Sequence, residues 1–310
     1  MMGALSVRTK YMTIVLLSAL VVAFESIALE SAINAADLKV FAVAAVPPLV
    51  GGLTLIGVSS RTTASFTRRL KRNEWAFFAT LCGFVSGGVL LWFDSIGRIG
   101  ASKEALLGGS SSEVLFVVVL SVVFLAERLS RWEILGSCLV VAGVSLVLFD
   151  EETMSLTLGL GEIEAILSSL LLAISVVMTT VMLKVHDLTP VSGLELFIPG
   201  VFLLCVGVAM GVITWPGMEG LLILLVLGIF PALGLLTYNS GLPKIGASLT
   251  SVLFSLTGIM TVGVALLLLA VLPEASLIIP GNLAVALLGG AVAFVGVVLL
   301  NWSPESRNPE

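Results

Sequence analysis

Long apolar runs recur along the whole chain, separated by short polar segments. A window of about 19 residues identifies ten runs that are long enough to cross a bilayer as helices. The ten runs are 11–34, 39–58, 75–95, 101–126, 132–149, 162–184, 191–215, 220–238, 246–272 and 281–302. This pattern predicts an all-α polytopic membrane protein with ten transmembrane helices.

The distribution of basic residues predicts how these helices are oriented. With the N-terminus in the cytoplasm, all of the 15 lysines and arginines except Lys39, Arg98 and Lys103 lie on the cytoplasmic side. The polar segment 61–74 dominates this bias, and its basic run is better explained as an anchor on anionic lipid than as a binding site. Both termini are then cytoplasmic, which requires an even number of spans and agrees with ten.

A short motif occurs twice, each time at the start of a long apolar run. Residues 98–102 read Arg-Ile-Gly-Ala-Ser, and residues 244–248 read Lys-Ile-Gly-Ala-Ser. Glycine spacing gives a second match, because Gly136 and Gly143 are seven residues apart, as are Gly289 and Gly296. These matches predict a duplication, although small-residue patterns are also common wherever transmembrane helices pack closely.

The duplication divides the chain into two units of five helices, residues 1–150 and 151–310. Since five is odd, the second unit enters the membrane from the opposite side. Such an inverted repeat is the architecture in which secondary transporters place their binding site near the midplane, between the halves.

The order of elements in the first unit resembles a known family. The small-residue entry at 98–102 is followed by an apolar helix ending in Leu-Ala-Glu-Arg-Leu at 125–129, and then by a span with Leu135-Gly136 and Gly143-Val144. This order is similar to the EamA domain of the drug/metabolite transporter superfamily. The resemblance implies a ten-helix secondary transporter with a central cavity, in a prokaryotic cell (inner) membrane, with spans five and ten at the periphery.

Two positions depart from the pattern of that family, and both introduce an acid. The family usually has a Trp-Gly pair in the first span, where this chain has Ala23-Phe24-Glu25, and commonly a proline in the fourth span near Glu113. At about 1.5 Å per residue, Glu25 lies about 13 Å and Glu113 about 16 to 18 Å from the outer ends of their spans. Acids at this depth favour a functional role, although a structural role for acids held neutral by neighbouring helices is the alternative.

If Glu25 and Glu113 share one cavity, they resist simultaneous ionisation, which suits a proton-coupled carrier. They would also bind a cationic or zwitterionic substrate, such as an amine or amino acid. Glu30 and Glu195 lie nearer the span ends, where interfacial placement explains an acid without a functional role.

Further candidate substrate contacts lie in the third, fourth, eighth and ninth spans. Ser110 belongs to a run of small residues directly before Glu113, which could admit substrate or serve close helix packing. Ser251 and Ser255 follow helical spacing on one face of the ninth span. Trp92 and Tyr238 could stack on a substrate cation, although anchoring at the membrane interface is the more usual role of such aromatics.

Composition agrees with a membrane protein and excludes several other classes. Hydrophobic residues make up 58% and charged residues 11% of the chain, against about 25% charged residues in soluble domains. No basic nucleic-acid footprint, metal-ligand cluster, phosphate loop or nucleophile elbow is present, so we expect no nucleic-acid partner, no cofactor, no metal and no enzymatic activity. The expected partners are a small-molecule substrate, the lipid bilayer and coupling protons, and the oligomeric state stays open.

Three other functions remain as alternatives. A lipid or lipid-linked substrate flippase would share the same scaffold. An intramembrane enzyme, such as a transferase, would need paired acids that hold a metal with a pyrophosphate, and no closely spaced Asp cluster lies inside a span. A sensor or scaffold would need a soluble domain or tail through which to signal.

Overall fold

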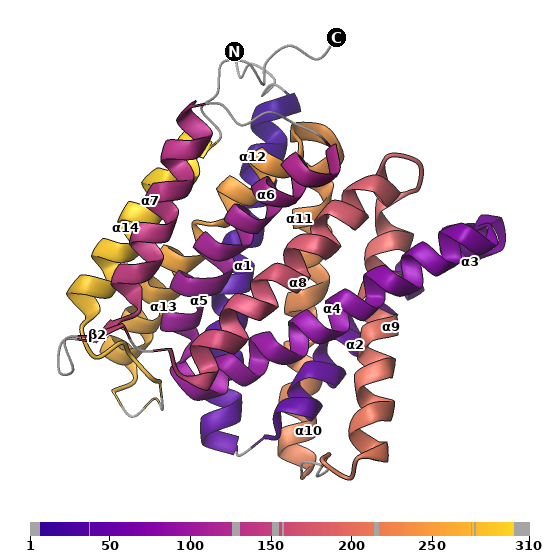
Figure 1. Ribbon diagram of the computed structural model, residues 1–310. Coiled ribbons are helices and arrows are strands. Elements are labelled where there is room, and N and C mark those ends of the chain that lie inside the picture. Colours follow the sequence, from indigo (N-terminus) through magenta and orange to yellow (C-terminus); the bar gives the residue numbers. More distant parts are fainter. Residues whose placement is uncertain are drawn as a thin grey trace, which may run out of the picture.

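The computed structural model shows a bundle of helices (Figure 1). It describes residues 7–36, 38–125, 131–150, 155–156, 158–213, 217–273, 275 and 277–300. The α-helices are α1 Val7–Ala36, α2 Val40–Val58, α3 Ser60–Arg69, α4 Arg72–Ile99, α5 Ala101–Leu107, α6 Glu113–Leu125, α7 Arg131–Val147, α8 Leu160–Leu183, α9 Leu188–Ala209, α10 Met218–Leu227, α11 Ile229–Ile245, α12 Ala247–Phe254, α13 Thr257–Val271 and α14 Leu283–Leu300. A π-helical segment, Gly108–Ser112, joins α5 to α6, and the two-residue strands β1 Phe149–Asp150 and β2 Ser155–Leu156 pair antiparallel.

Every predicted apolar run contains helix, which confirms the all-helical membrane fold. Within the described residues, seven helical stretches are long and apolar enough to cross a membrane: Val7–Asn34, Val40–Val58, Arg72–Ile99, Leu160–Leu183, Leu188–Ala209, Met218–Ile245 and Leu249–Val271. The apolar helices in the fifth and tenth predicted runs, Ile134–Val147 and Leu283–Leu299, are shorter, and the fourth run is broken by the π-helical segment. The count of ten spans and the inverted repeat therefore stay predictions.

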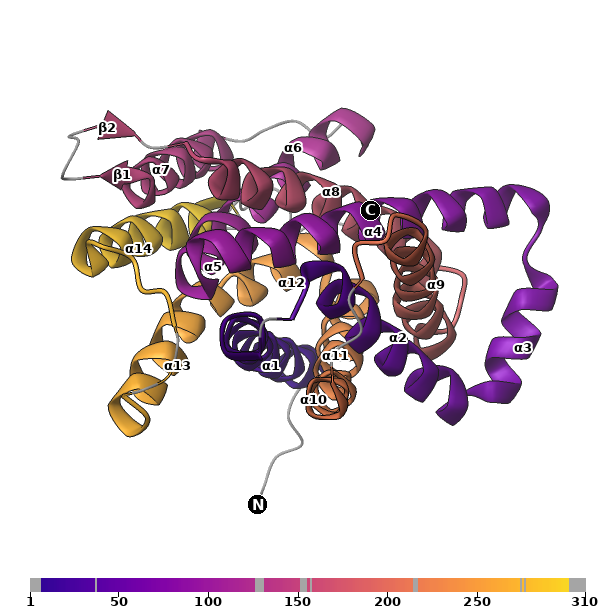
Figure 2. The same ribbon diagram turned by 90° about the horizontal axis from the view of Figure 1, so that it is seen from below.

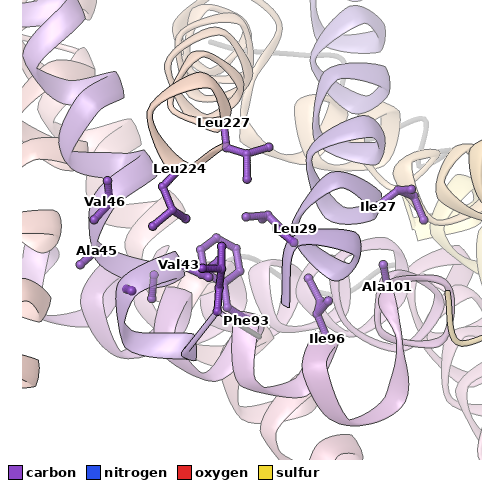
Figure 3. Packing of buried hydrophobic residues seen from close by; sticks show 14 of the residues in the cluster. Ile27, Leu29, Val43, Ala45, Val46, Phe93, Ile96, Ala101, Leu224 and Leu227 are labelled. Atoms are coloured by element: carbon purple, nitrogen blue, oxygen red, sulfur yellow. The ribbon is translucent and has the colours of Figure 1, made fainter. Parts of the chain in front are cut away.

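Four helix pairs make the most extensive contacts: α7 with α14, α2 with α9, α4 with α8, and α1 with α11. Both views show α7 and α14 side by side at one edge of the bundle, with α1 and α11 together nearer its middle (Figures 1 and 2). A large apolar core joins α1, α2, α4 and α10, where Leu29, Val43, Phe93 and Leu224 are almost completely buried (Figure 3). Many other large apolar side chains face outward, as expected for helices surrounded by lipid.

The four glycines of the predicted repeat form the contact between α7 and α14. A Cβ added to Gly143 would lie 2.5 Å from the carbonyl oxygen of Gly289, and one added to Gly296 would lie 2.6 Å from the carbonyl oxygen of Gly136. Main chain therefore touches main chain along this pair, which only glycine allows. The small-residue pattern has a packing role here, whatever its evolutionary origin.

We expect Gly143→Leu to destabilise the protein, because the new side chain would force α7 and α14 apart. Overpacking of a close contact costs about 1 to 3 kcal/mol. Thermal unfolding in detergent, followed by circular dichroism, measures the change. The matched control is Gly263→Leu in α13, where no described atom of a neighbour lies within 4 Å of an added Cβ. Equal unfolding temperatures for the two variants would contradict the close contact.

Candidate functional site

A cavity of about 170 Å³ lies inside the bundle, between the helices of the two predicted units. Its walls come from α1, α2, α4, α5, α6, the π-helical segment, α8, α9, α11, α12 and α13. Most of the lining is apolar, but four carboxylic side chains reach it: Glu25, Glu104, Glu113 and Glu195. Four acids around one small apolar cavity are costly unless each one is neutralised, hydrogen-bonded or paired with a ligand.

Two of these acids have no partner in the described part of the chain. Glu25 lies in the middle of α1 and is 3% exposed, and Glu113 begins α6 and is 6% exposed. No hydrogen bond or ion pair among the described residues involves either carboxyl group. Their unmet hydrogen-bonding capacity is therefore available to a ligand or a proton.

Glu104, in contrast, is held by an aromatic neighbour. The indole Nε1 of Trp92 donates a hydrogen bond of 2.9 Å to Glu104 Oε2. The other carboxyl oxygen of Glu104 packs against Gly108, where a Cβ would meet it at 2.4 Å. Glu104 also interacts electrostatically with Glu113, so two acids of the fourth predicted span lie close together.

Glu195 is the centre of a polar network that joins three helices. Thr179 Oγ1 of α8 donates to Glu195 Oε1 at 2.8 Å, and Asn239 Nδ2 of α11 lies 3.0 Å from Glu195 Oε2. The same Asn239 nitrogen lies 3.0 Å from the hydroxyl of Ser192 in α9. The network satisfies a buried acid and ties α8, α9 and α11 together on one side of the cavity.

The predicted site residues divide into three groups. Glu25, Glu113, Trp92 and Tyr238 line the cavity. Ser251 lies behind this surface, where its hydroxyl is 3.1 Å from the Tyr238 hydroxyl. The Ser255 hydroxyl donates to the carbonyl of Val252 in its own turn and does not line the cavity.

One predicted site residue and the Glu-Arg-Leu signature lie outside the described part of the chain. Two acids that line the cavity were not predicted as site residues. The side chain of Ser110 lies outside the described residues, as do Glu127–Leu129 of the Glu-Arg-Leu signature. The sequence reasoning did not select Glu104, and it gave Glu195 an interfacial explanation. A search for acids one or two turns inside each apolar run would have found both.

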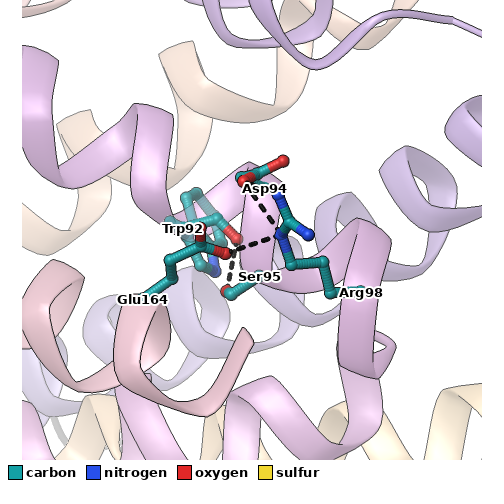
Figure 4. A network of polar contacts seen from close by, with 5 residues as sticks. All are labelled: Trp92, Asp94, Ser95, Arg98 and Glu164. Atoms are coloured by element: carbon teal, nitrogen blue, oxygen red, sulfur yellow. Dashed lines mark hydrogen bonds and ion pairs between the residues drawn. The ribbon is translucent and has the colours of Figure 1, made fainter. Parts of the chain in front are cut away.

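A polar cluster closes one end of the bundle. Glu30 of α1, fully buried, accepts a 3.0 Å hydrogen bond from the Ala101 amide of α5 and another from the Ile278 amide between α13 and α14. Beside it, Arg98 pairs with Asp94 of α4 at 2.9 Å and with Glu164 of α8 at 3.0 Å (Figure 4). Helices from both predicted units are therefore tied together at this end.

Two glycines show how differently the two ends of the bundle are packed. Gly100 and Gly246, the central residues of the repeated motif, have nearly the same backbone angles, φ 80° and ψ 152° against φ 88° and ψ 154°. Both conformations are left-handed, so glycine is required at each. The backbone of Ile278 covers Gly100, with its oxygen 2.5 Å from an added Cβ, whereas no described atom lies within 4 Å of one on Gly246.

Comparison with known proteins identifies the family of the first half. Residues 9–149 match the model of the EamA-like transporter family. These residues are EamA-like, and the EamA-like transporter family belongs to the drug/metabolite transporter superfamily. This confirms the resemblance seen in the sequence, and members of this family are membrane transporters of small solutes. The EamA-like stretch contains Glu25, Glu104 and Glu113, whereas Glu195 and Tyr238 follow it in the chain.

The fold of the whole chain is similar to that of a solved structure. A structure titled only "Crystal structure of protein" has 18% sequence identity and a TM-score of 0.64, and the match covers 94% of this chain and 98% of that one. At this identity the likeness concerns the fold alone. A search of curated proteins gave no match to the sequence.

Proposed function

We propose that this protein is a secondary active transporter that exports or exchanges small organic solutes, such as amines, amino acids or related metabolites. The observation that carries the proposal is the cavity inside the apolar bundle, into which two carboxyl groups reach that have no partner among the described residues. A cavity with polar groups at membrane depth is what a solute carrier requires. Residues that would bind substrate are Glu25, Glu113, Trp92 and Tyr238.

The proposed mechanism is alternating access between two inverted five-helix units, residues 1–150 and 151–310. The major helix contacts support this division. If the two units are exchanged, α1 corresponds to α8, α4 to α11, α2 to α9 and α7 to α14. The contact of α1 with α11 then becomes that of α8 with α4, and the contacts of α2 with α9 and of α7 with α14 stay the same. The matched conformations of Gly100 and Gly246 and the end of the family match at residue 149 agree with it. Such units can rock around a fixed site.

Proton coupling through Glu25 and Glu113 is part of the proposal. Two acids in one apolar cavity resist simultaneous ionisation, so a cationic substrate and a proton would compete for them. The positive-inside rule favours cytoplasmic termini. A prokaryotic inner membrane is proposed as the location on the basis of the resemblance to the EamA-like family.

Solute counterflow in proteoliposomes tests the transport proposal. Vesicles that contain the purified protein are loaded with an unlabelled amine, amino acid or sugar phosphate, and uptake of the same labelled compound is followed. We expect uptake above that of protein-free vesicles for at least one class. Reconstituted vesicles with a fluorescent lipid test the flippase alternative in parallel, and lipid movement without solute uptake would replace the transporter by a flippase.

A further inference from the structure

The described lining of the cavity offers free hydrogen-bond acceptors but few free donors. Glu25 and Glu113 offer four carboxyl oxygens that have no partner in the described part of the chain. A ligand that fits this surface has to donate hydrogen bonds or carry a positive charge, because unmet buried acceptors are costly.

The donors that line the cavity are already engaged with protein acceptors. The indole of Trp92 donates to Glu104, and the amide of Asn239 is hydrogen-bonded to Glu195 and Ser192. The described hydroxyls behave alike: Ser26, Ser168, Ser169, Ser175 and Thr257 donate to backbone carbonyls. The hydroxyl of Tyr238 pairs with Ser251. Little donor capacity therefore remains for an anionic group of a ligand.

The charged residues of the lining also favour a cationic ligand. The described lining contains four acids and neither lysine, arginine nor histidine. A substrate carboxylate would lose its hydration in an apolar cavity, meet like charges and find no cation. An ammonium or guanidinium group would instead favour ionisation of Glu25 or Glu113 and form charge-assisted hydrogen bonds with the resulting carboxylate.

We infer that the cavity recognises organic cations that carry N–H donors on an apolar body, and that it rejects compounds that carry a free carboxylate. The inference rests on the proposed transport function, since it names the substrate class of the same cavity. Amines are therefore favoured over amino acids. The rest of the cavity accommodates the apolar body, since Phe93 and Phe254 line it together with aliphatic side chains.

Three probes with the same benzyl body separate the possibilities. Phenethylamine carries only the ammonium group, phenylalanine adds a carboxylate, and 3-phenylpropanoate carries only the carboxylate. Their affinities for purified wild-type protein can be measured by isothermal titration calorimetry in detergent. We expect phenethylamine to bind at least about tenfold more tightly than phenylalanine, and 3-phenylpropanoate not to bind.

Variants locate the binding in the cavity. Phenethylamine should lose affinity on Glu25→Gln and on Glu113→Gln but not on Glu219→Gln, a control that removes an exposed acid from the start of α10. Phenylalanine binding as tightly as the amine would overturn the inference and leave the transport proposal intact. Binding of none of the three probes by the wild type would also overturn it, whereas the transport proposal is decided separately by counterflow.

Discussion

Glu113→Gln is expected to lower amine counterflow in proteoliposomes by about 30-fold or more. The carboxyl group of Glu113 is buried at the cavity wall and has no partner among the described residues, so it can bind a substrate cation. Removal of one member of a buried charge pair costs about 2 to 5 kcal/mol, and about 1.4 kcal/mol corresponds to a factor of ten. Initial rates below saturation provide the measurement, because they report the loss as kcat/KM.

The same variant should be at least as stable as the wild type when no ligand is present. Glutamine keeps the size of the side chain and removes an acid that is buried at a cost. An unfolding temperature equal to or above that of the wild type would show that the activity loss is not a folding defect. Retention of wild-type counterflow, with its full dependence on pH, would refute both the substrate and the proton-coupling roles of Glu113. Glu219→Gln should leave counterflow unchanged.

Glu30→Ala should cause the largest loss of stability among single side-chain truncations at the closed end of the bundle. The truncation removes the acceptor of two backbone amides, the buried one of Ala101 and the part-buried one of Ile278. Hydrogen bonds to a charged group contribute about 1.5 to 3 kcal/mol each, so the free energy of unfolding should fall by about 3 kcal/mol or more. Thermal or denaturant unfolding in detergent measures the fall.

A control for this prediction lies near Ile278 in the chain. Asn282 accepts one hydrogen bond of 3.0 Å from the Val285 amide at the start of α14, and Asn282→Ala should cost only about 1 kcal/mol. Should Glu30→Ala not accumulate, Glu30→Gln gives an intermediate case, because its amide retains one acceptor oxygen and directs a donor toward an amide hydrogen. Equal effects of Glu30→Ala and Asn282→Ala would contradict the bridging role of Glu30.

Apolar periodicity was sufficient to predict where the helices lie, because a bilayer demands long apolar runs whatever their neighbours are. It could not predict the breaks within runs, such as the π-helical segment before Glu113, since these depend on packing against other helices. Glu25 and Glu113 were predictable as candidate site residues from their depth alone. That Glu25 and Glu113 line the same cavity depends on helix rotation, and one residue step turns a side chain by about 100°.

The acids that the sequence reasoning missed have physical explanations. Glu104 follows Lys103 near the start of a run, so hydropathy alone places it at the membrane surface. In the structure, Glu30 accepts hydrogen bonds from the first amide of α5 and from the Ile278 amide. Glu104 accepts a hydrogen bond from Trp92 inside the bundle. Glu195 is hydrogen-bonded to Asn239, which is distant in sequence and is brought to it by the packing of α9 against α11.

The contrast between Gly100 and Gly246 has a kinetic consequence. Main-chain contact with Ile278 covers Gly100, whereas no described atom lies within 4 Å of a Cβ added to Gly246. In the proposed carrier, the end held by such a contact would open less readily than the other, so the protein would spend unequal times facing the two compartments. Its apparent affinity for one solute would then differ between measurements from the two sides. A solute on either side binds only the fraction of protein molecules that face that side. The bias would leave the final concentration ratio unchanged, since that ratio is set by the driving gradient.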